Sequence, residues 1–364
     1  MNAPLDAWNV SADDFPVDGT SEEKLWFLVR YAVLAPSTHN TQPWRFRIHG
    51  NVVELYADFT RALPVVDPDN RELIMSCGAA LLHLRAAICY FGYACNVELL
   101  PEAGDSALLA RVHLGFKRDT SAEDILLFNA IPKRRTNRQA FLQDPVPGAL
   151  LATLTRIAGE EGAWLQIVEG EEARYAAADL VAEADRLQWA NKQFRRELAG
   201  WLYPRRSDGR DGIPGYAQGD GALPAYAGPA VIRTFDLGKG QAAKHRDIAL
   251  YSPVLAVLGT ETDTRVDWLA AGQALANVLL RARVEDVWAS FLNQPIEVPE
   301  LRPQLASIIG RVGFPQLLLR LGFGPEVKPT PRRSDQDVIH QTASAHHRAN
   351  ADLTRLGLGT TAIE

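Results

Sequence analysis

Two long apolar helix patterns constrain the fold of this chain more than any other feature of its sequence. One covers residues 71–93 and the other covers residues 266–288. Large apolar side chains recur in them at spacings of three and four residues, which is typical of helices that bury one face. The first contains the run GAAL, beginning at Gly78, and the second contains GQAL, beginning at Gly272. Because 47% of the residues are apolar, we expect both helices to lie in a substantial core.

The elements around the two long patterns follow one another in a similar order. A helix pattern and a strand pattern precede each long helix: 21–34 and WRFRIH before the first, 146–158 and 163–168 before the second. Strand patterns also follow each: NVELLP and ALLARVHLGF after the first, ASFLNQP and PQLLLRLGF after the second. A further apolar run, SPVLAVLGT, has the pattern of a buried strand. The recurring order predicts a duplicated unit.

These patterns predict four segments along the chain. An irregular arm occupies residues 1–20, a first half 21–120, a second half 121–340, and a loose tail 341–364. Ser21 is placed to cap the first helix. The second half is expected to contain one helix at 171–202 and then a Gly/Pro-rich loop at 203–240. A loop of that length is usually functional or disordered.

Composition and short motifs exclude several classes of function. The net charge of −6 gives no indication of nucleic-acid binding. The first residues lack the basic and apolar regions of a signal peptide, and no apolar run is expected to reach membrane-spanning length. The three cysteines form no CxxC motif, so a reducing cytoplasm is the expected location. No HExxH, P-loop, GxGxxG or GxSxG motif is present, so neither a metal site nor a catalytic nucleophile is predicted.

The run APSTHNTQPW places six consecutive hydrogen-bonding side chains between a helix pattern and a strand pattern. The six side chains extend from Ser37 to Gln42, between two prolines. Short polar side chains at a helix end can bind the edge of a heteroaromatic ring or sugar hydroxyls. They can equally serve only to satisfy the backbone of the turn. On local chemistry alone, the second interpretation is the more common one.

A basic turn, RRTNR, begins at Arg134 and is the second candidate. Arginine side chains offer forked donors and Thr136 adds a hydroxyl, a combination that suits a phosphate group. A solvated surface run is the alternative. The pair Arg332–Arg333, which follows a Pro-rich stretch, is no signal by itself.

Together these segments resemble the nitroreductase family of FMN-binding flavoproteins. The run APSTHNTQPWRF matches the pattern APS-x-x-N-x-QPW-x-F, RRTNR resembles RRS-x-R, and PRRSDQDVI resembles a basic C-terminal segment that binds phosphate. The doubled unit and the run DPDNREL are most similar to the Acg-type branch, a fused tandem of two nitroreductase units. The resemblance covers residues 22–340. It implies an α+β fold with two pseudo-symmetric halves, each having a mainly antiparallel sheet flanked by helices.

The resemblance also implies one FMN per chain, at the interface of the two halves. The first half carries the APS segment but no RRxxR before its first helix, whereas the second half carries RRTNR but no APS segment. One complete site can therefore form. The implied contacts are Arg134, Arg135, Thr136, Arg138, Arg332 and Arg333 at the phosphate end, with Pro36, Ser37, Thr38 and Asn40 along the ring and ribityl chain.

Other positions carry weaker expectations from the same resemblance. His39 occupies a variable motif position and is expected to face solvent. The run FLNQP at 291–295 is a candidate for the segment that contacts flavin N5. Asn191 and Lys192 are candidates for further flavin contacts.

The function implied is that of an FMN-dependent oxidoreductase. NAD(P)H would give hydride to flavin N5, and a small acceptor, nitroaromatic or quinone-like, would then take the electrons, with no catalytic side chain required. The alternative is a protein that sequesters FMN, with loop 203–240 as a lid that excludes the nicotinamide. Oxygen-dependent fragmentation of flavin and a scaffold without flavin are further alternatives. Neither a nucleic-acid nor a membrane partner is expected, and the fused halves would act as a pseudo-dimer.

Overall fold

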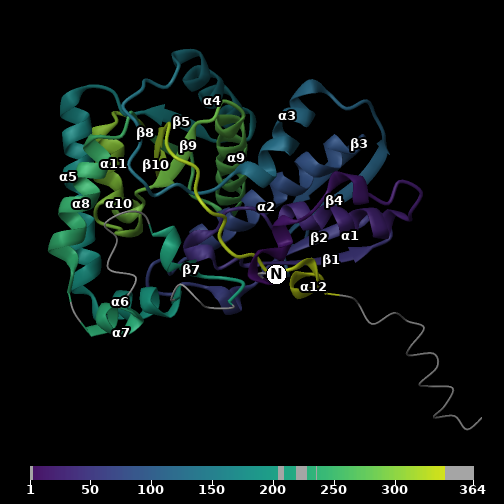
Figure 1. The fold of residues 1–364 in the computed structure, drawn as a ribbon, viewed down its shortest axis with the longest axis horizontal. Helices are drawn as coiled ribbons and strands as arrows, with labels where there is room; N and C mark the ends of the chain where they lie inside the picture. Colours follow the sequence, from purple (N-terminus) through teal and green to yellow (C-terminus); the bar gives the residue numbers. More distant parts are fainter. Residues whose placement is uncertain (1–2, 204–208, 219–227, 235, 341–364) are drawn as a thin grey trace, which may run out of the picture.

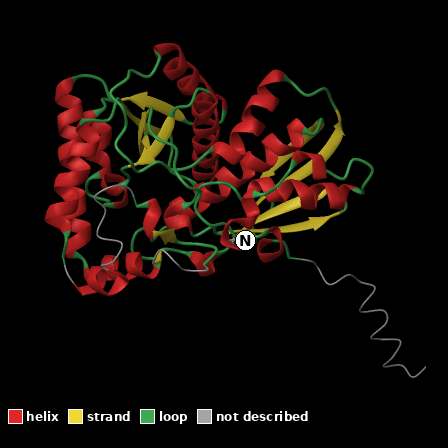
Figure 2. Cartoon of the chain, in the orientation of Figure 1, coloured by secondary structure: helices red, strands yellow, loops and turns green. Residues whose placement is uncertain are grey.

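The computed structural model describes residues 3–203, 209–218, 228–234 and 236–340, which contain two four-stranded sheets (Figure 1). The first has the order β1 (Trp44–His49), β2 (Val52–Ala57), β4 (Leu108–Lys117) and β3 (Tyr93–Leu99). The second has the order β5 (Trp164–Ile167), β8 (Val254–Thr260), β10 (Phe314–Gly322) and β9 (Trp288–Phe291). All neighbours in both sheets are antiparallel, which confirms the expected α+β class (Figure 2).

Both sheets have the same strand order relative to the chain. In each, the first strand is at one edge, followed by the second, the fourth and the third. In the first sheet, the register pairs Phe46 with Leu55, and both side chains are fully buried, as the alternating pattern predicts. In the second sheet, every residue of β8 is buried. This sheet is therefore covered on both faces, and apolar clusters pack against it from each side.

The two long helices pack against each other between the sheets (Figure 1). They are α2 (Arg71–Tyr90) and α9 (Arg265–Val284), and both were predicted. At their crossing, a Cβ atom added to Gly78 would lie 3.1 Å from the Cα of Gly272. The two matching glycines therefore face each other, because only residues without a side chain let the two backbones approach this closely. Met75 of α2 packs in the core of the second half, so the helix pair joins both cores.

The α2 helix is long and apolar enough to cross a membrane by length and composition. The expectation that no apolar run reaches this length is therefore wrong. However, 83% of its most apolar window is buried inside the protein. Its apolar character is that of a core helix.

The main difference between the halves is an insertion between the first two strands of the second sheet. Gly50 and Asn51 connect β1 to β2, whereas residues 168–253 connect β5 to β8. This connection, called the insertion below, contains α5 (Glu171–Ala190), α6 (Lys192–Gly200), α7 (Gly228–Thr234) and α8 (Gly238–Leu250). It also contains a short parallel pair, β6 (Leu202–Tyr203) and β7 (Ile213–Pro214). Figure 1 shows α5 and α8 side by side at the outer edge of the second half.

The prediction of one helix over 171–202 is wrong. Asn191 has extended backbone angles and its side chain accepts a hydrogen bond from the backbone N–H of Gln193, so it ends α5 and caps α6. The predicted loop 203–240 also contains helical residues, those of α7 and the start of α8. Residues 204–208, 219–227 and 235 of that loop lie outside the described residues.

The remaining helices flank the two sheets. Those predicted are α1 (Ser21–Ala32) and α4 (Gly148–Glu160); those not predicted are α3 (Ala122–Ala130), α10 (Gln294–Glu297), α11 (Arg302–Ile308) and α12 (Asp335–Val338). The α1 helix is capped by Thr20, which forms a capping box with Glu23, and not by Ser21 as expected. In the arm, Ala3–Trp8 and Ala12–Asp14 form 3₁₀ helices. The predicted tail 341–364 lies outside the described residues.

Two segments outside the sheets pair with strands, and one of them crosses from the second half to the first. Thr136, in the basic turn, forms a β-bridge with Ala289 of β9. Residues 323–340, here called the C-terminal strap, leave the second sheet and return to the first (Figure 1). There Ile339 forms a β-bridge with Phe46, and the backbone N–H of His340 donates to the Phe46 carbonyl at 2.8 Å. The strap thereby lies against the edge strand β1.

Candidate functional site

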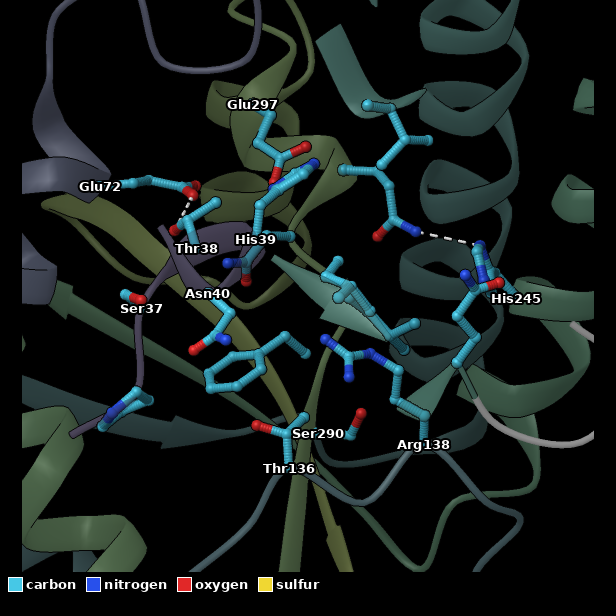
Figure 3. A pocket seen from close by; sticks show the side chains of 18 of the residues that line it. Ser37, Thr38, His39, Asn40, Glu72, Thr136, Arg138, His245, Ser290 and Glu297 are labelled. Atoms are coloured by element: carbon cyan, nitrogen blue, oxygen red, sulfur yellow. Dashed lines mark hydrogen bonds between the residues drawn. The ribbon is translucent and has the colours of Figure 1, made fainter. Parts of the chain in front are cut away.

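A cavity of about 330 Å³ lies where the two halves meet (Figure 3). This volume falls in the range of small-molecule sites, roughly 300–1,000 Å³. The first half contributes residues 36–40 and one face of α2 to the walls. The second half contributes the basic turn, β9, α10 and β10, and the insertion and the C-terminal strap complete the enclosure.

The polar run forms one wall of this cavity, in an unusual backbone conformation. His39, Asn40 and Gln42 all have positive φ angles, of 52°, 57° and 51°. Such angles are strained for residues other than glycine and persist only where surrounding contacts hold them. Part of that support is local, since Ser37 Oγ accepts a hydrogen bond from the Gln42 N–H at 2.9 Å.

The rest of the support comes from distant segments. Asn40 Nδ2 donates to the carbonyl of Gly212 in the insertion at 2.9 Å and to that of Pro331 in the strap at 3.0 Å. Gln42 Nε2 donates to the Arg210 carbonyl at 2.8 Å. The run therefore forms hydrogen bonds within its own turn. It also forms hydrogen bonds to the insertion and to the C-terminal strap, two segments that line the cavity. Neither sequence interpretation foresaw the second role.

Three arginines give the cavity a cationic end: Arg138, Arg320 and Arg332. None of them forms an ion pair with a carboxylate among the described residues. They donate hydrogen bonds to oxygens of carbonyl, hydroxyl and amide groups. Burial lowers the pKa of Arg138 to about 10, and burial with the nearby Arg138 lowers that of Arg320 to about 10. Burial and two neighbouring arginines hold the pKa of Arg332 well below its usual range. Clustered cations without counterions favour the binding of an anion.

Seven of the ten residues predicted from the sequence line this cavity. They are Pro36, Ser37, Thr38, Asn40, Thr136, Arg138 and Arg332.

The structure does not bring the other three predicted arginines to the cavity. Arg134 is buried and donates to the Leu34 carbonyl, at 3.2 Å. Arg135 lies over the ring of Trp8, with 4.6 Å between guanidinium carbon and ring centroid. Arg333 donates to the carbonyls of Gln42 and Asp337. These arginines hold the basic turn, the N-terminal arm and the strap in place.

Two carboxyl groups lie at the other end of the cavity, near the top of Figure 3. Glu72, on α2, is almost fully buried; its carboxylate accepts from Thr38 Oγ1 at 2.7 Å and pairs with Arg71 at 2.9 Å. Glu297, on α10, accepts from Gln188 Nε2 at 2.6 Å. Burial and the nearby Glu72 raise the pKa of Glu297 to about 8, so at neutral pH this carboxyl is mostly protonated.

This raised pKa predicts a pH-dependent stability. Between pH 4.5, the ordinary value for glutamate, and about 8, the folded protein holds the Glu297 proton and the unfolded chain does not. The contribution of Glu297 to the free energy of unfolding is therefore fully present below pH 4.5. It is lost as the pH rises from 4.5 to about 8. Urea unfolding of the flavin-free protein gives the difference in unfolding free energy between Glu297→Gln and the wild type. We expect this difference to favour the variant by at least about 1 kcal/mol more at pH 8 than at pH 5.

The matched control is Glu300→Gln, which changes an exposed glutamate of the same region that does not line the cavity. Its unfolding free energy should differ from that of the wild type by the same amount at both pH values. If Glu297→Gln behaved in the same way, Glu297 would ionise normally in the folded protein.

Two histidines line the cavity. His39 was expected to face solvent, but it lies in the cavity wall, where burial and Arg138 lower its pKa to about 4 and keep it neutral. His245, on α8, pairs through Nδ1 with Asp185 of α5 at 2.7 Å. Neither His245 nor Asp185 was singled out from the sequence.

The insertion supplies an apolar part of the cavity wall. It contributes Trp189, Phe194, Leu198, Leu202, Ile213, Ile232 and Ile248. Phe291 and the three residues after it, the candidate segment for flavin N5, also line the cavity. Asn191 and Lys192 do not, because Asn191 caps α6 and Lys192 is exposed.

Arg320 is the residue that sequence reasoning could have found. It is a single charge within the apolar strand PQLLLRLGF, and a charged residue in a strand buried on both faces needs a partner or a ligand. The residues of the insertion gave no such signal, since their partners are distant in sequence.

The fold and the cavity define an α+β protein with a cavity lined by both halves, cationic at one end and with apolar side chains in its walls. No protein-family model matches the sequence. A Mycobacterium tuberculosis protein provisionally named an NAD(P)H nitroreductase is 34% identical over 319 residues, covering 85% of this chain and 88% of the relative. A second one from that organism, provisionally named the NAD(P)H nitroreductase acg, is 28% identical, covering 87% of this chain and 96% of the relative. The chain belongs to this nitroreductase family.

One solved structure with a similar fold is the FMN-dependent nitroreductase NfnB from Mycobacterium smegmatis in complex with NADPH. It is 15% identical and has a TM-score of 0.39, and the match covers 60% of this chain and 98% of that chain.

Proposed function

We propose that this protein is an FMN-dependent oxidoreductase, which passes hydride from NAD(P)H to a small organic acceptor, nitroaromatic or quinone-like. The observation that carries the proposal is the cluster formed by Arg138, Arg320 and Arg332 at one end of a cavity with apolar side chains in its walls. Within the part of the chain that the structure describes, none of these cations has a carboxylate partner. A ligand with a phosphate and a flat apolar ring complements both parts. The names of the relatives point to the same chemistry.

The residues present fit FMN in this cavity. The three arginines and Thr136 would hold the phosphate, and Arg332 Nε is buried without a hydrogen-bond partner among the described residues. Residues 36–40 would line one side of the ring, with Met75, Leu275 and Leu317 available for apolar contact. When bound, FMN would supply the capacity to accept and release hydride, so no side-chain nucleophile is needed.

The proposed site needs both halves of a fused pseudo-dimer, 21–120 and 121–340. The shared strand order of the two sheets and the facing glycines of α2 and α9 support a duplicated unit. A single site is supported because the basic turn and the strap, both from the second half, line the same cavity as residues 36–40 of the first half. We place the protein in the cytoplasm.

A second candidate function, sequestration of FMN, is favoured by the insertion. Ile213, Gln218 and Ile232 belong to the Gly/Pro-rich segment and line the cavity. A segment that lies over a bound flavin would exclude the nicotinamide ring, and the protein would then store the cofactor.

The absorption spectrum of the purified protein, followed by anaerobic addition of NADH and NADPH, separates the two functions. We expect a flavin band that bleaches with at least one of the two donors. A flavin band that stays oxidised with both donors would favour sequestration. The absence of a flavin band, even after addition of FMN, would contradict both functions.

A further inference from the structure

The cavity contains a histidine–aspartate pair that hydride transfer does not require. Asp185 is almost fully buried and accepts from His245 Nδ1 at 2.7 Å, while Gln294 Nε2 reaches its other oxygen at 3.4 Å. Gln294 Nε2 also lies 3.0 Å from His245 Nδ1. Because the Asp185 carboxylate can only accept and is the nearer partner, we assign the Nδ1 proton to the bond with Asp185. His245 Nε2 then has no hydrogen-bond partner among the described residues, and the ring lines the cavity. A histidine oriented by a buried carboxylate, with its second nitrogen open to a cavity, is a typical arrangement for proton transfer.

The helices that carry Asp185 and His245 also bring apolar side chains to the cavity. Trp189 of α5 and Ile248 of α8 line it. In Figure 3, His245 and Ser37 lie on opposite sides of the view. Ser37 belongs to residues 36–40, the wall that we assign to the flavin ring. Both helices, α5 and α8, belong to the insertion, which has no counterpart in the first half.

We propose that His245 donates a proton to an oxygen of the acceptor as the acceptor is reduced, and that Asp185 is its positioning residue. This inference rests on the proposed function. A quinone becomes a hydroquinone by gaining two electrons and two protons. One proton and both electrons would come as hydride from the reduced flavin, and the second proton would leave Nε2 of the doubly protonated His245 ring for the acceptor oxygen. The imidazole is then neutral and regains a proton from solvent.

Acceptors that differ in their need for a proton test this role. The flavin is first reduced photochemically, so that the result is independent of NADH and NADPH, and the protein is then mixed with 1,4-naphthoquinone or with ferricyanide. Ferricyanide takes up single electrons and no proton. We expect His245→Gln to slow reoxidation by naphthoquinone about a hundredfold, in the range typical of general acids, and reoxidation by ferricyanide less than about twofold. Equal effects on both acceptors, or no effect on either, would overturn the proposal.

Two further variants separate positioning from structure. Asp185→Asn should lower the naphthoquinone rate and alter its pH profile, again without changing the ferricyanide rate. His49→Gln, which alters an exposed histidine at the end of β1, is the matched control and should change neither rate. The titratable groups facing His245 are Asp185 from α5, Lys244 from α8 and Glu297 from α10. Because Glu297 has a pKa of about 8, the pH profile is also recorded for Glu297→Gln.

A binding measurement completes the test without catalysis. The anion of 2-hydroxy-1,4-naphthoquinone is titrated into flavin-free wild type and His245→Gln by calorimetry. We expect the variant to bind this anion about tenfold more weakly, because the imidazole no longer donates to its oxygen, and His49→Gln to bind like the wild type. Equal affinities would overturn the proposal. If the wild type held no flavin at all, the proposed function would fail, and this titration alone would decide the role of His245.

Discussion

Replacing Arg138 with methionine is expected to weaken FMN binding about a hundredfold. Loss of one partner from a buried, hydrogen-bonded charge pair costs about 2–5 kcal/mol. Arg138 is a suitable choice because, among the described residues, its guanidinium donates to a single carbonyl, that of Ala217. Affinity is measured by titrating flavin-free protein and following the quenching of flavin fluorescence.

Riboflavin, which lacks the phosphate, provides an internal comparison. If Arg138 holds the phosphate, Arg138→Met should weaken FMN binding strongly and riboflavin binding by less than a few-fold. Equal losses for both ligands would place Arg138 beside the ring or ribityl chain.

The matched control is Arg333→Met. The resemblance to known family motifs assigns Arg333 to the phosphate, whereas the structure places it against backbone carbonyls outside the cavity. We therefore expect its FMN affinity to stay within a few-fold of the wild type. A large loss would contradict the placement of the strap and favour the assignment based on the motif.

Replacing Gly272 with alanine is expected to destabilise the protein by about 3 kcal/mol, at the upper end of the range for overpacked cores. The added Cβ would lie 2.9 Å from the Cα of Met75, a distance that real Cβ atoms essentially never show. Backbone atoms cannot turn aside as a flexible side chain can, so the two helices would have to separate. Urea unfolding of the flavin-free protein measures the change.

Gly159→Ala is the control for this substitution. Gly159 is also a helical glycine, in α4, but an added Cβ there would meet no atom within 4 Å. We expect its effect to be neutral or stabilising, by up to about 1 kcal/mol, because alanine restricts the unfolded chain. If both variants had equal stability, the crossing of α2 and α9 would be wider than described.

The elements that could be predicted from the sequence are those whose signal is local. The periodicity of α2 and α9 and the alternation of β1 and β2 each reflect burial of one face, so they appear in the sequence itself. The polar run and the basic turn were recognised from motif similarity, and seven of the ten predicted residues line one cavity.

The elements that could not be predicted depend on distant contacts. Whether helix 171–202 continues or breaks is decided at Asn191, by a cap that a single side chain provides. The carboxyl of Asp185 meets His245 only because α5 and α8 pack together, across 60 residues of chain. Arg333 and Arg332 are neighbours in sequence, but the strap turns only Arg332 toward the cavity, which spacing alone cannot reveal.

The C-terminal strap determines when this protein can become functional during its synthesis. Chains emerge from the ribosome N-terminus first, so the first sheet is made long before the segment that pairs with its edge at Phe46. Until residues 331–340 have emerged, Asn40 lacks its partners Pro331 and Arg332, and the cavity lacks the Arg332 cation. Contacts of such large sequence separation also form slowly. In the function we propose, loading of a phosphorylated cofactor would therefore follow synthesis of the strap. A chain truncated before the strap would lose both the Arg332 cation and the pairing at the edge of the first sheet.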